Sequence, residues 1–292
     1  MSIHKTVLLN ETIEGLLAPQ KAGKEKLVVL DCTFGGGGHS IEILKRFPKV
    51  KIIALDQDKN VWKQNDIRIS FFNENFSDLD KVLGNEKVDG IIFDLGLSSD
   101  QLENSGRGFS FMKDEPLLMT MKENPSSEDV TAEDIVNTWE EKNLADIIYG
   151  YGEEKYSRRI ARAIVIAREN AKINTTQDLV KIIEGAVPGV YRRGRIHFAT
   201  RTFQALRIAV NDELGVLQKG LEKGFERLKG GGRMTVISFH SLEDRITKRF
   251  FKEKEKMGLA FLINKKPIKA EESEIKNNPR SRSAKLRIIE KS

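Results

Sequence analysis

Cysteine, histidine and long apolar runs are scarce in this sequence of 292 residues. The single cysteine, Cys32, excludes an intramolecular disulfide and a cysteine-based zinc site, and it fits a reducing compartment. The four histidines, His4, His39, His197 and His240, have no metal-ligand spacing, so we predict no metal site. No stretch reaches the length of a membrane span, and the N-terminus lacks the apolar region of a signal peptide. We therefore expect a cytoplasmic protein without a membrane anchor.

Neither sign of charge dominates, because 49 Lys and Arg residues face 43 Asp and Glu residues for a net charge of +6. This balance alone favours a polyanionic partner only weakly. The distribution is more informative, since basic residues gather just before a helical segment and again near the C-terminus. We take the following as candidate contacts to nucleic acid: Arg192, Arg193, Arg195, Lys265, Lys266, Arg280 and Arg282.

Short apolar runs alternate with segments of helical spacing in the first part of the chain. The runs are Val28–Leu30, Ile52–Leu55, Ile67–Phe72 and Gly90–Phe93, and a helical segment covers Ile41–Phe47. Acidic residues, Asp31, Asp56 and Asp94, directly follow three of the runs. Such alternation is typical of a doubly wound parallel sheet, whose ligand lies outside the carboxyl ends of the strands. We predict an α/β fold with its site at these three acids.

The pattern changes after Leu102, where helical segments follow one another without a convincing strand. They cover Ala132–Tyr149, Glu153–Asn170 and Thr176–Val187, and a long helix is expected over Thr200–Leu228. The strand signal resumes at Met234–Ser238, a helix follows over Leu242–Lys256, and Ala284–Glu290 is expected to form the last, edge strand. We therefore predict a sheet domain made of residues 1–104 and 199–292, interrupted by an all-helical domain at 105–198.

A glycine-rich segment, Asp31–His39, joins the first strand to the first helix of the sheet. Glycines at such a junction let backbone N–H groups approach a ligand closely, although a tight turn alone would also use them. Asp56 is placed to bind the two hydroxyls of a ribose, which indicates an adenosine-containing ligand. The loop lacks the G-x-G-x-x-G pattern of nicotinamide enzymes, so S-adenosylmethionine fits better. Phe76 follows the third strand and could pack on the adenine or simply in the core.

With these motifs in hand, the sequence resembles the MraW family of bacterial small-subunit ribosomal RNA cytosine N4-methyltransferases. The resemblance is carried by Asp31–Ser40 and Asp94–Ser99 and extends almost from end to end of the chain. Further matching blocks are His4–Glu11, Arg107–Phe111, Tyr151–Glu154, Arg159–Ile164, Thr200–Arg207, Ser238–Arg245 and Asn277–Arg282.

The resemblance implies a class I, Rossmann-like methyltransferase domain with an inserted helical domain that recognises the substrate. It implies methylation of a specific cytidine in the decoding region of small-subunit (16S) RNA, with the RNA or the small ribosomal subunit as partner. The positions that match the family's binding site for S-adenosylmethionine are Gly37, Gly38, His39, Asp56, Phe76, Asp94 and Gln101. The oligomeric state stays open, with a homodimer among the assemblies considered.

One block departs from the family pattern, next to the expected pocket. Where the family commonly has Gly-Pro-Leu-Asp-Met-Arg-Met-Asp, this chain has Glu115–Lys122, which reads Glu-Pro-Leu-Leu-Met-Thr-Met-Lys. Two acids and an arginine are therefore lost. We favour a divergent subfamily with the same reaction over altered specificity or impaired activity.

Methyl transfer is an in-line displacement that mainly requires alignment in a partly dry pocket. The exocyclic amine of cytosine is a poor nucleophile. A hydrogen-bond acceptor at the amine hydrogens should increase its nucleophilicity. We expect Asp94, or the carbonyl of Leu95, to serve, with Ser98 and Ser99 shaping the loop; the plainer alternative is that Asp94 only caps the strand. His39 is expected to contact the cofactor rather than act as a base, and the role of His240 stays open.

Rival functions remain at this stage. Cofactor motifs do not name the acceptor, so a methyltransferase for another RNA or for protein is one alternative. A ribosome-assembly or RNA-binding factor that keeps the fold without turnover is a second, supported only by the altered Leu118–Lys122 segment. A nicotinamide oxidoreductase is a distant third.

Overall fold

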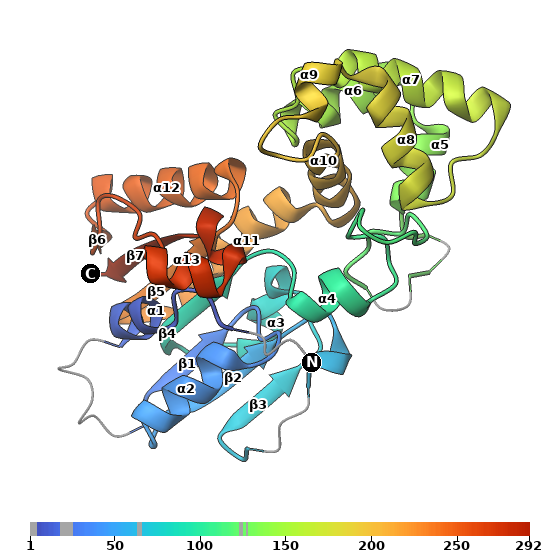
Figure 1. The fold of residues 1–292 in the computed structure, drawn as a ribbon. Coiled ribbons are helices and arrows are strands. Elements are labelled where there is room, and N and C mark those ends of the chain that lie inside the picture. The colour runs from blue at the N-terminus through green and yellow to red at the C-terminus, as the bar shows by residue number, and fades with distance from the viewer. Residues whose placement is uncertain (1–4, 18–25, 63–65, 123–124, 127) are drawn as a thin grey trace. The chain divides into compact units, whose positions relative to one another are not determined.

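The computed structural model describes residues 5–17, 26–62, 66–122, 125–126 and 128–292. The chain divides into two units: a sheet unit, Met1–Gly96 with Leu214–Ser292, and a helical unit, Leu97–Glu213 (Figure 1). The predicted boundaries at 104/105 and 198/199 thus differ from the division that the structure gives. The helix Thr200–Asn211, which we had assigned to the sheet domain, belongs to the helical unit because its Phe203, Ala205 and Leu206 lie in the helical core.

The described part of the sheet unit holds a seven-stranded sheet in the order β3-β2-β1-β4-β5-β7-β6. The first five strands along the chain run parallel, whereas β7 is antiparallel to both β5 and β6. Their bounds are β1 Val28–Asp31, β2 Lys51–Leu55, β3 Ile69–Phe72, β4 Val88–Asp94, β5 Leu228–Ser238, β6 Ala260–Leu262 and β7 Lys285–Lys291. The predicted α/β sheet is confirmed.

Helices cover both faces of this sheet, because successive residues of each strand point to opposite sides. In β1, Val29 packs in one apolar cluster with Ile13 and Ile43, whereas Leu30 packs in another with Leu221 and other residues of the opposite face. The first face carries α1 (Leu9–Leu16) and α2 (Gly38–Arg46). The second carries α3 (Leu79–Leu83), α11 (Glu213–Arg227) and α12 (Ser241–Lys256).

The last strand is not at the edge, contrary to expectation. The strand β7 pairs with β5 on one side and with β6 on the other, so β6 forms the edge. The sequence analysis missed β6 because it is only three residues long, and one of them, Phe261, is 63% exposed. A short helix α13 (Glu272–Asn277) and the 3₁₀ helix η4 (Pro279–Ser283) lead into β7.

The long helix expected over Thr200–Leu228 is in fact two. The helix α10 (Thr200–Asn211) ends where Asp212 adopts a left-handed conformation with φ of 46°, and α11 then begins at Glu213. Aspartate tolerates this conformation better than most residues, so it can stop a helix without glycine. The segment expected over Ala132–Tyr149 is also broken, into α5 (Ala132–Thr138) and α6 (Glu141–Gly150), because Trp139 is extended.

The helical unit packs around its own apolar core. Leu144 and Ile148 of α6 meet Ile160 and Ile164 of α7 (Ser157–Asn170), and Ile183 of α8 (Thr176–Ala186) belongs to the same cluster. Two shorter helices complete the unit, α4 (Ser99–Asn104) and α9 (Gly189–Arg192). Over the described residues of both units, no helix is long and apolar enough to cross a membrane.

Candidate cofactor and acceptor site

The glycine loop after β1 is shaped for close approach of a ligand. Gly37 has a positive φ of 72°, and a Cβ added there would lie 2.6 Å from Phe34 Cζ, so a side chain is excluded. By contrast, a Cβ added at Gly36 would meet no protein atom within 4 Å, so the loop is open on that side. Gly38 begins α2 directly afterwards. The loop therefore combines a tight turn with an open backbone flank, as a ligand cradle requires.

Asp31 anchors this loop from within the protein. Its carboxylate accepts a hydrogen bond from Ser40 Oγ at 2.6 Å and another from Thr33 N at 3.2 Å. Burial raises the pKa of Asp31 to about 6, against the lowering effect of these two bonds. The Thr33 hydroxyl in turn accepts the N–H of Asp94 at 2.7 Å, which ties the loop to the end of β4. Ser40 and Thr33 were missed by the sequence analysis, because nothing in their local pattern marks a buried carboxylate as partner.

Asp56, at the end of β2, has both carboxylate oxygens bonded to backbone. One accepts from Gly35 N at 2.8 Å and the other from Asp58 N at 2.9 Å. Burial raises the pKa of Asp56, and these backbone bonds oppose the rise. The carboxylate is thus held in one orientation beside the glycine loop. The backbone of Gln57 contributes a third hydrogen bond, which leaves about one of the carboxylate's four lone-pair sites for a ligand hydroxyl.

Asp94, at the end of β4, lies in a different environment. Its Oδ1 is inaccessible to solvent and has no hydrogen-bond partner within the described chain, although the side chain as a whole is 24% exposed. Its Oδ2 lies 3.6 Å from Nδ1 of His39, which is longer than a hydrogen bond. Burial, reinforced by the charges of Asp31 and Glu243, raises the pKa of Asp94 to about 8. An unsatisfied buried carboxylate oxygen points to a missing partner.

His39 is 5% exposed and lies between Val7 and Asp94 of the sheet unit. Its Nε2 is 3.2 Å from the carbonyl oxygen of Val7, while its Nδ1 faces Asp94. A proton on Nε2 would satisfy the Val7 carbonyl and leave Nδ1 as an acceptor. The structure therefore brings together His39, Asp94 and the glycine loop, while the role of His39 in cofactor binding stays a prediction.

Phe76 is half-buried and packs against the apolar core of the sheet unit. It opens the 3₁₀ helix η3 (Phe76–Asp78), and its ring meets the edge of Phe93 at 5.3 Å between centroids. A Cβ at Gly220 of α11 would lie 2.6 Å from Phe76 Cδ2, so the helix approaches this ring closely. These contacts account for Phe76 as a packing residue, and its contact with an adenine stays a prediction.

Ser98 and Gln101 cap α4 in the helical unit. Gln101 N donates to Ser98 Oγ at 3.1 Å, and Ser98 N donates to Gln101 Oε1 at 3.0 Å, which forms a capping box. Gln101 is 9% exposed. Ser99 is the first helical residue, and its side chain lies outside what the structure describes. The structure thus assigns Ser98 and Gln101 a local role, and their contact with cofactor or substrate stays a prediction.

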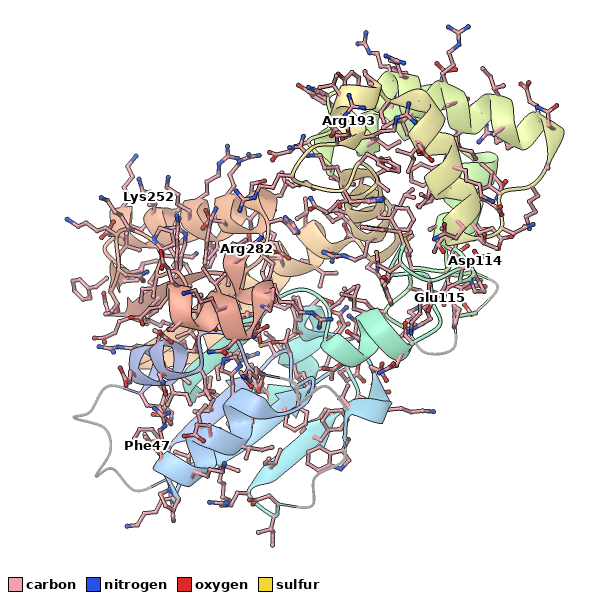
Figure 2. All side chains as sticks on the ribbon, viewed as in Figure 1. Phe47, Asp114, Glu115, Arg193, Lys252 and Arg282 are labelled. Atoms are coloured by element: carbon pink, nitrogen blue, oxygen red, sulfur yellow. The ribbon has the colours of Figure 1, made fainter. Side chains whose placement is uncertain are left out.

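The candidate RNA contacts occur in both units. In the helical unit, Arg192, Arg193 and Arg195 are exposed, and Arg192 forms an ion pair with Glu184 at 3.3 Å (Figure 2 labels Arg193). In the sheet unit, Lys265, Lys266 and Arg282 are exposed, whereas Arg280 is half-buried.

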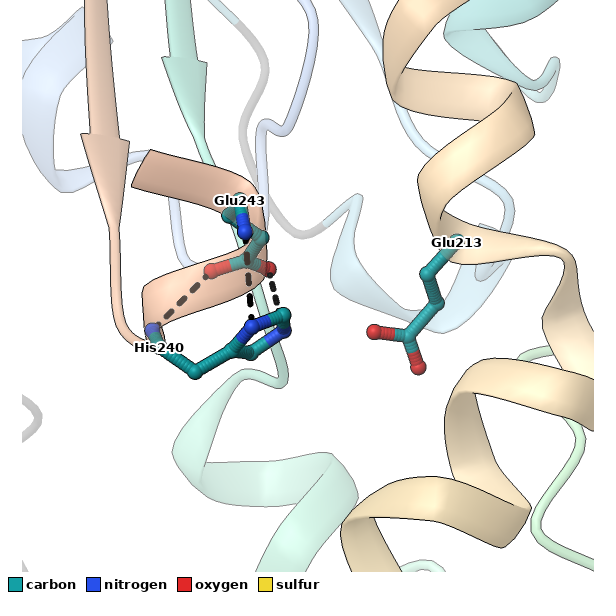
Figure 3. A group of neighbouring side chains, drawn as sticks. All are labelled: Glu213, His240 and Glu243. Atoms are coloured by element: carbon teal, nitrogen blue, oxygen red, sulfur yellow. Dashed lines mark hydrogen bonds and ion pairs between the residues drawn. The ribbon is translucent and has the colours of Figure 1, made fainter. Parts of the chain in front are cut away.

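Glu243, at the start of α12, is a further buried group near Asp94 that the sequence analysis missed. Its carboxylate accepts from Phe239 N at 2.8 Å. It also accepts from His240 N at 3.3 Å, and Nδ1 of His240 accepts the N–H of Glu243 (Figure 3). This is a capping box with histidine at the N-cap. The spacing His-x-x-Glu before a helix was a usable signal, hidden because histidine is an uncommon cap. His240 thus has a structural role, and the absence of a metal site stays a prediction.

Comparison with known proteins identifies the family. The sequence matches the MraW methylase family over residues 1–292. This chain belongs to the MraW methylase family. It is 47% identical over 295 residues to "Ribosomal RNA small subunit methyltransferase H" of Synechococcus elongatus, covering 99% of this chain and 94% of that relative. The protein of the same name from Anaplasma marginale is 49% identical over 300 residues, covering 98% of each chain.

A solved rRNA methylase from Streptococcus thermophilus aligns over 99% of both chains with 11% identity and a TM-score of 0.41. The family model and the curated relatives, which match over the full length of the chain, confirm the family resemblance inferred from the sequence. Membership in a methylase family also confirms that the protein is a methyltransferase and supports S-adenosylmethionine as the methyl donor. The seven-stranded, mostly parallel α/β sheet agrees with that class of enzyme.

Proposed function

We propose that this MraW-family methylase transfers a methyl group from S-adenosylmethionine to N4 of one cytidine in the decoding region of small-subunit ribosomal RNA. The observation that carries the proposal is the unsatisfied, buried Oδ1 of Asp94 at the end of β4. The relatives named as small-subunit ribosomal RNA methyltransferases support the choice of RNA.

The residues present fit the cofactor. The open flank at Gly36 leaves room for a ligand beside the loop, and the orphaned Oδ1 of Asp94 offers an acceptor at the next strand end. Gly37, Gly38 and His39 would form the cradle, and the oriented carboxylate of Asp56 would accept a ribose hydroxyl. When bound, S-adenosylmethionine supplies an electrophilic methyl on a positively charged sulfonium. Phe76 and Gln101 complete the proposed set of contacts.

Asp94 would act on the acceptor amine. A carboxylate that accepts a hydrogen from the exocyclic amine holds it in line with the methyl and increases electron density at nitrogen. The raised pKa of about 8 gives Asp94 a strong tendency to accept a proton or a hydrogen bond. A cationic cofactor nearby favours the ionised form, and thus prepares Asp94 for this role. The carbonyl of Leu95 is the second candidate acceptor.

The helical unit is proposed to recognise the substrate, with Arg192, Arg193 and Arg195 holding the RNA backbone. Its divergent segment Glu115–Lys122 is held largely through its backbone and buried apolar side chains. Met119 N donates to Arg107 O at 2.7 Å, Asn211 Nδ2 donates to Met119 O at 2.8 Å, and Leu117 and Met119 are fully buried. Side chains that differ from the family add contacts of their own, since Glu115 accepts the N–H of Gly108 at 3.0 Å and Lys122 forms an ion pair with Asp129. The segment is therefore well anchored with the residues it has, which favours retention of the reaction.

The decisive experiment combines the purified protein, labelled S-adenosylmethionine and small ribosomal subunits that lack the modification. Digestion of the RNA and identification of the labelled nucleoside should give N4-methylcytidine at one site, and Asp94→Ala should abolish it. Label at another nucleoside would overturn the acceptor assignment. Cofactor binding without any transfer would instead favour an assembly factor without turnover.

A further inference from the structure

A small basic pocket lies beside the start of α12 in the sheet unit. Its volume is about 280 Å³, and its polar lining comprises His240, Ser241, Lys269, Arg282, Ser283 and Lys285. The volume falls below the range of about 300–1,000 Å³ typical of sites that enclose a whole small ligand. The pocket therefore suits one charged group of a larger molecule.

The lining carries three cations and no carboxylate. Within the described chain, neither Lys269 nor Arg282 has a carboxylate partner, whereas Lys285 lies 3.2 Å from Asp244. That aspartate is also bound by Arg287 at 2.7 Å, which lowers the pKa of its carboxyl and compensates its charge. The free charges of Lys269 and Arg282 thus dominate the pocket and favour an anion.

The pocket wall continues the same strand edge that carries the cofactor residues. Phe239 and His240 directly follow β5, whose Ile237 pairs with Asp94 of the neighbouring parallel strand β4. Adjacent strands lie about 4.8 Å apart, so the two strand ends are close. The positive end of the 16-residue helix α12 also faces this region through its first residue, Ser241. A negatively charged group here would flank an acceptor base placed at Asp94.

We infer that this pocket binds one phosphate of the RNA backbone next to the target nucleotide. The inference rests on the proposed function for its ligand. Arg282 and Lys269 supply charge-assisted hydrogen bonds, and the hydroxyls of Ser241 and Ser283 supply neutral ones, which together match the oxygens of a phosphodiester. The aromatic Phe239 forms part of the apolar wall. The pocket thereby fixes the register of the RNA strand rather than reading its sequence.

The test uses the full chain with Lys269→Gln and Arg282→Gln combined, and Lys252→Gln with Lys256→Gln, both exposed on α12, as the control matched in charge. Lys252 is exposed on α12 (Figure 2), and lies about 16 Å along the helix from Ser241 at about 1.5 Å per residue. Binding of a labelled oligoribonucleotide containing the target sequence is measured at several salt concentrations. The double variant should bind roughly tenfold more weakly, with a salt slope reduced by about 1 or more, whereas the control should change less than about twofold. Equal losses in both variants would overturn the pocket.

A second arm separates an RNA phosphate from a free phosphate ion. Inorganic phosphate should compete with RNA on the wild-type protein more strongly than chloride at the same ionic strength, and this excess should disappear in the double variant. A phosphate effect that the variant loses without any change in RNA affinity would identify a site for the free ion and overturn the RNA assignment.

The outcome is separable from that of the proposed function. Should the wild-type protein form no N4-methylcytidine while the double variant still shows its selective loss of RNA binding, the methylation proposal fails and the pocket stands. Should methylation proceed with the same KM for subunits in the double variant and the control, the pocket proposal fails alone.

Discussion

The ends of β2 and β4 both carry an aspartate, yet the surrounding protein makes different hydrogen bonds to the two carboxylates. Asp56 has a backbone N–H on each oxygen, whereas Asp94 has a buried Oδ1 without a partner. Burial raises the pKa of both carboxyls, and that of Asp94 rises to about 8. Under the proposed function, the bonded carboxylate of Asp56 accepts a neutral hydroxyl, whereas the unsatisfied carboxylate of Asp94 contacts a group that arrives with the substrates.

The largest effect should come from removing the carboxylate of Asp94, and it should fall on the rate of methyl transfer. We expect Asp94→Ala to lower kcat for methyl transfer by about 10²–10³-fold, because the amine loses its acceptor in the transition state. Single-turnover transfer to small subunits measures this directly, with the thermal melt as a control for folding. Turnover within about threefold of wild type would show that Asp94 only terminates the strand.

Removal of the carboxylate of Asp56 should affect the binding of the cofactor rather than the rate of methyl transfer. Asp56→Ala should weaken the affinity for S-adenosylmethionine by roughly tenfold or more, since the hydroxyl contact is lost. The rate at saturating cofactor should change much less. Calorimetric titration gives the affinity, and Asp56→Asn, which keeps an acceptor oxygen, should be intermediate. An unchanged affinity in the alanine variant would place the ribose elsewhere.

Loss of the hydrogen bond between Ser40 and Asp31 should affect stability more than activity. Ser40→Ala removes the 2.6 Å hydrogen bond to the buried Asp31 and should cost about 1–3 kcal/mol in the free energy of unfolding. The pKa of Asp31, already about 6, should rise further because the Ser40 bond lowers it. Urea denaturation at pH 7.5, above the wild-type pKa of about 6, measures the loss. A variant as stable as wild type would show that the loop does not depend on this bond.

A neutral residue in place of Asp94 should increase the stability of the fold. Because its folded pKa is raised above the ordinary value of 3.8, the wild-type protein loses stability as pH rises from about 4 to about 8. Asp94→Asn has no such ionisation. Its Tm should therefore exceed that of wild type by about 3 °C or more at pH 8, and the difference should shrink toward pH 4. A difference that does not vary with pH would contradict the raised pKa.

Much of this site could be predicted from local sequence. The order of apolar runs, the acids that end them and the glycine loop are read over a few residues each, and the structure gives each of those strands and the loop their expected order. Matching blocks along the chain likewise predicted the family that the comparisons show. The contacts of Phe76 and Gln101 could not be predicted from the local sequence. Phe76 packs on Phe93, and Gln101 takes part in the capping box of α4.

The sequence by itself determined the type of sheet, the strands that end at Asp31, Asp56 and Asp94, and the methylase family, because periodicity, strand-end residues and ordered motifs are local properties. Tertiary structure alone decided that β7 lies between β5 and β6, that α10 ends at Asp212, and that Asp94 is left unsatisfied while Asp56 is not. The physical reason is that strand pairing, helix termination at a left-handed residue and the pKa of a carboxyl depend on neighbours distant in sequence. Ser40 and Glu243 belong to that second class, since each acts through a partner brought to it by the fold.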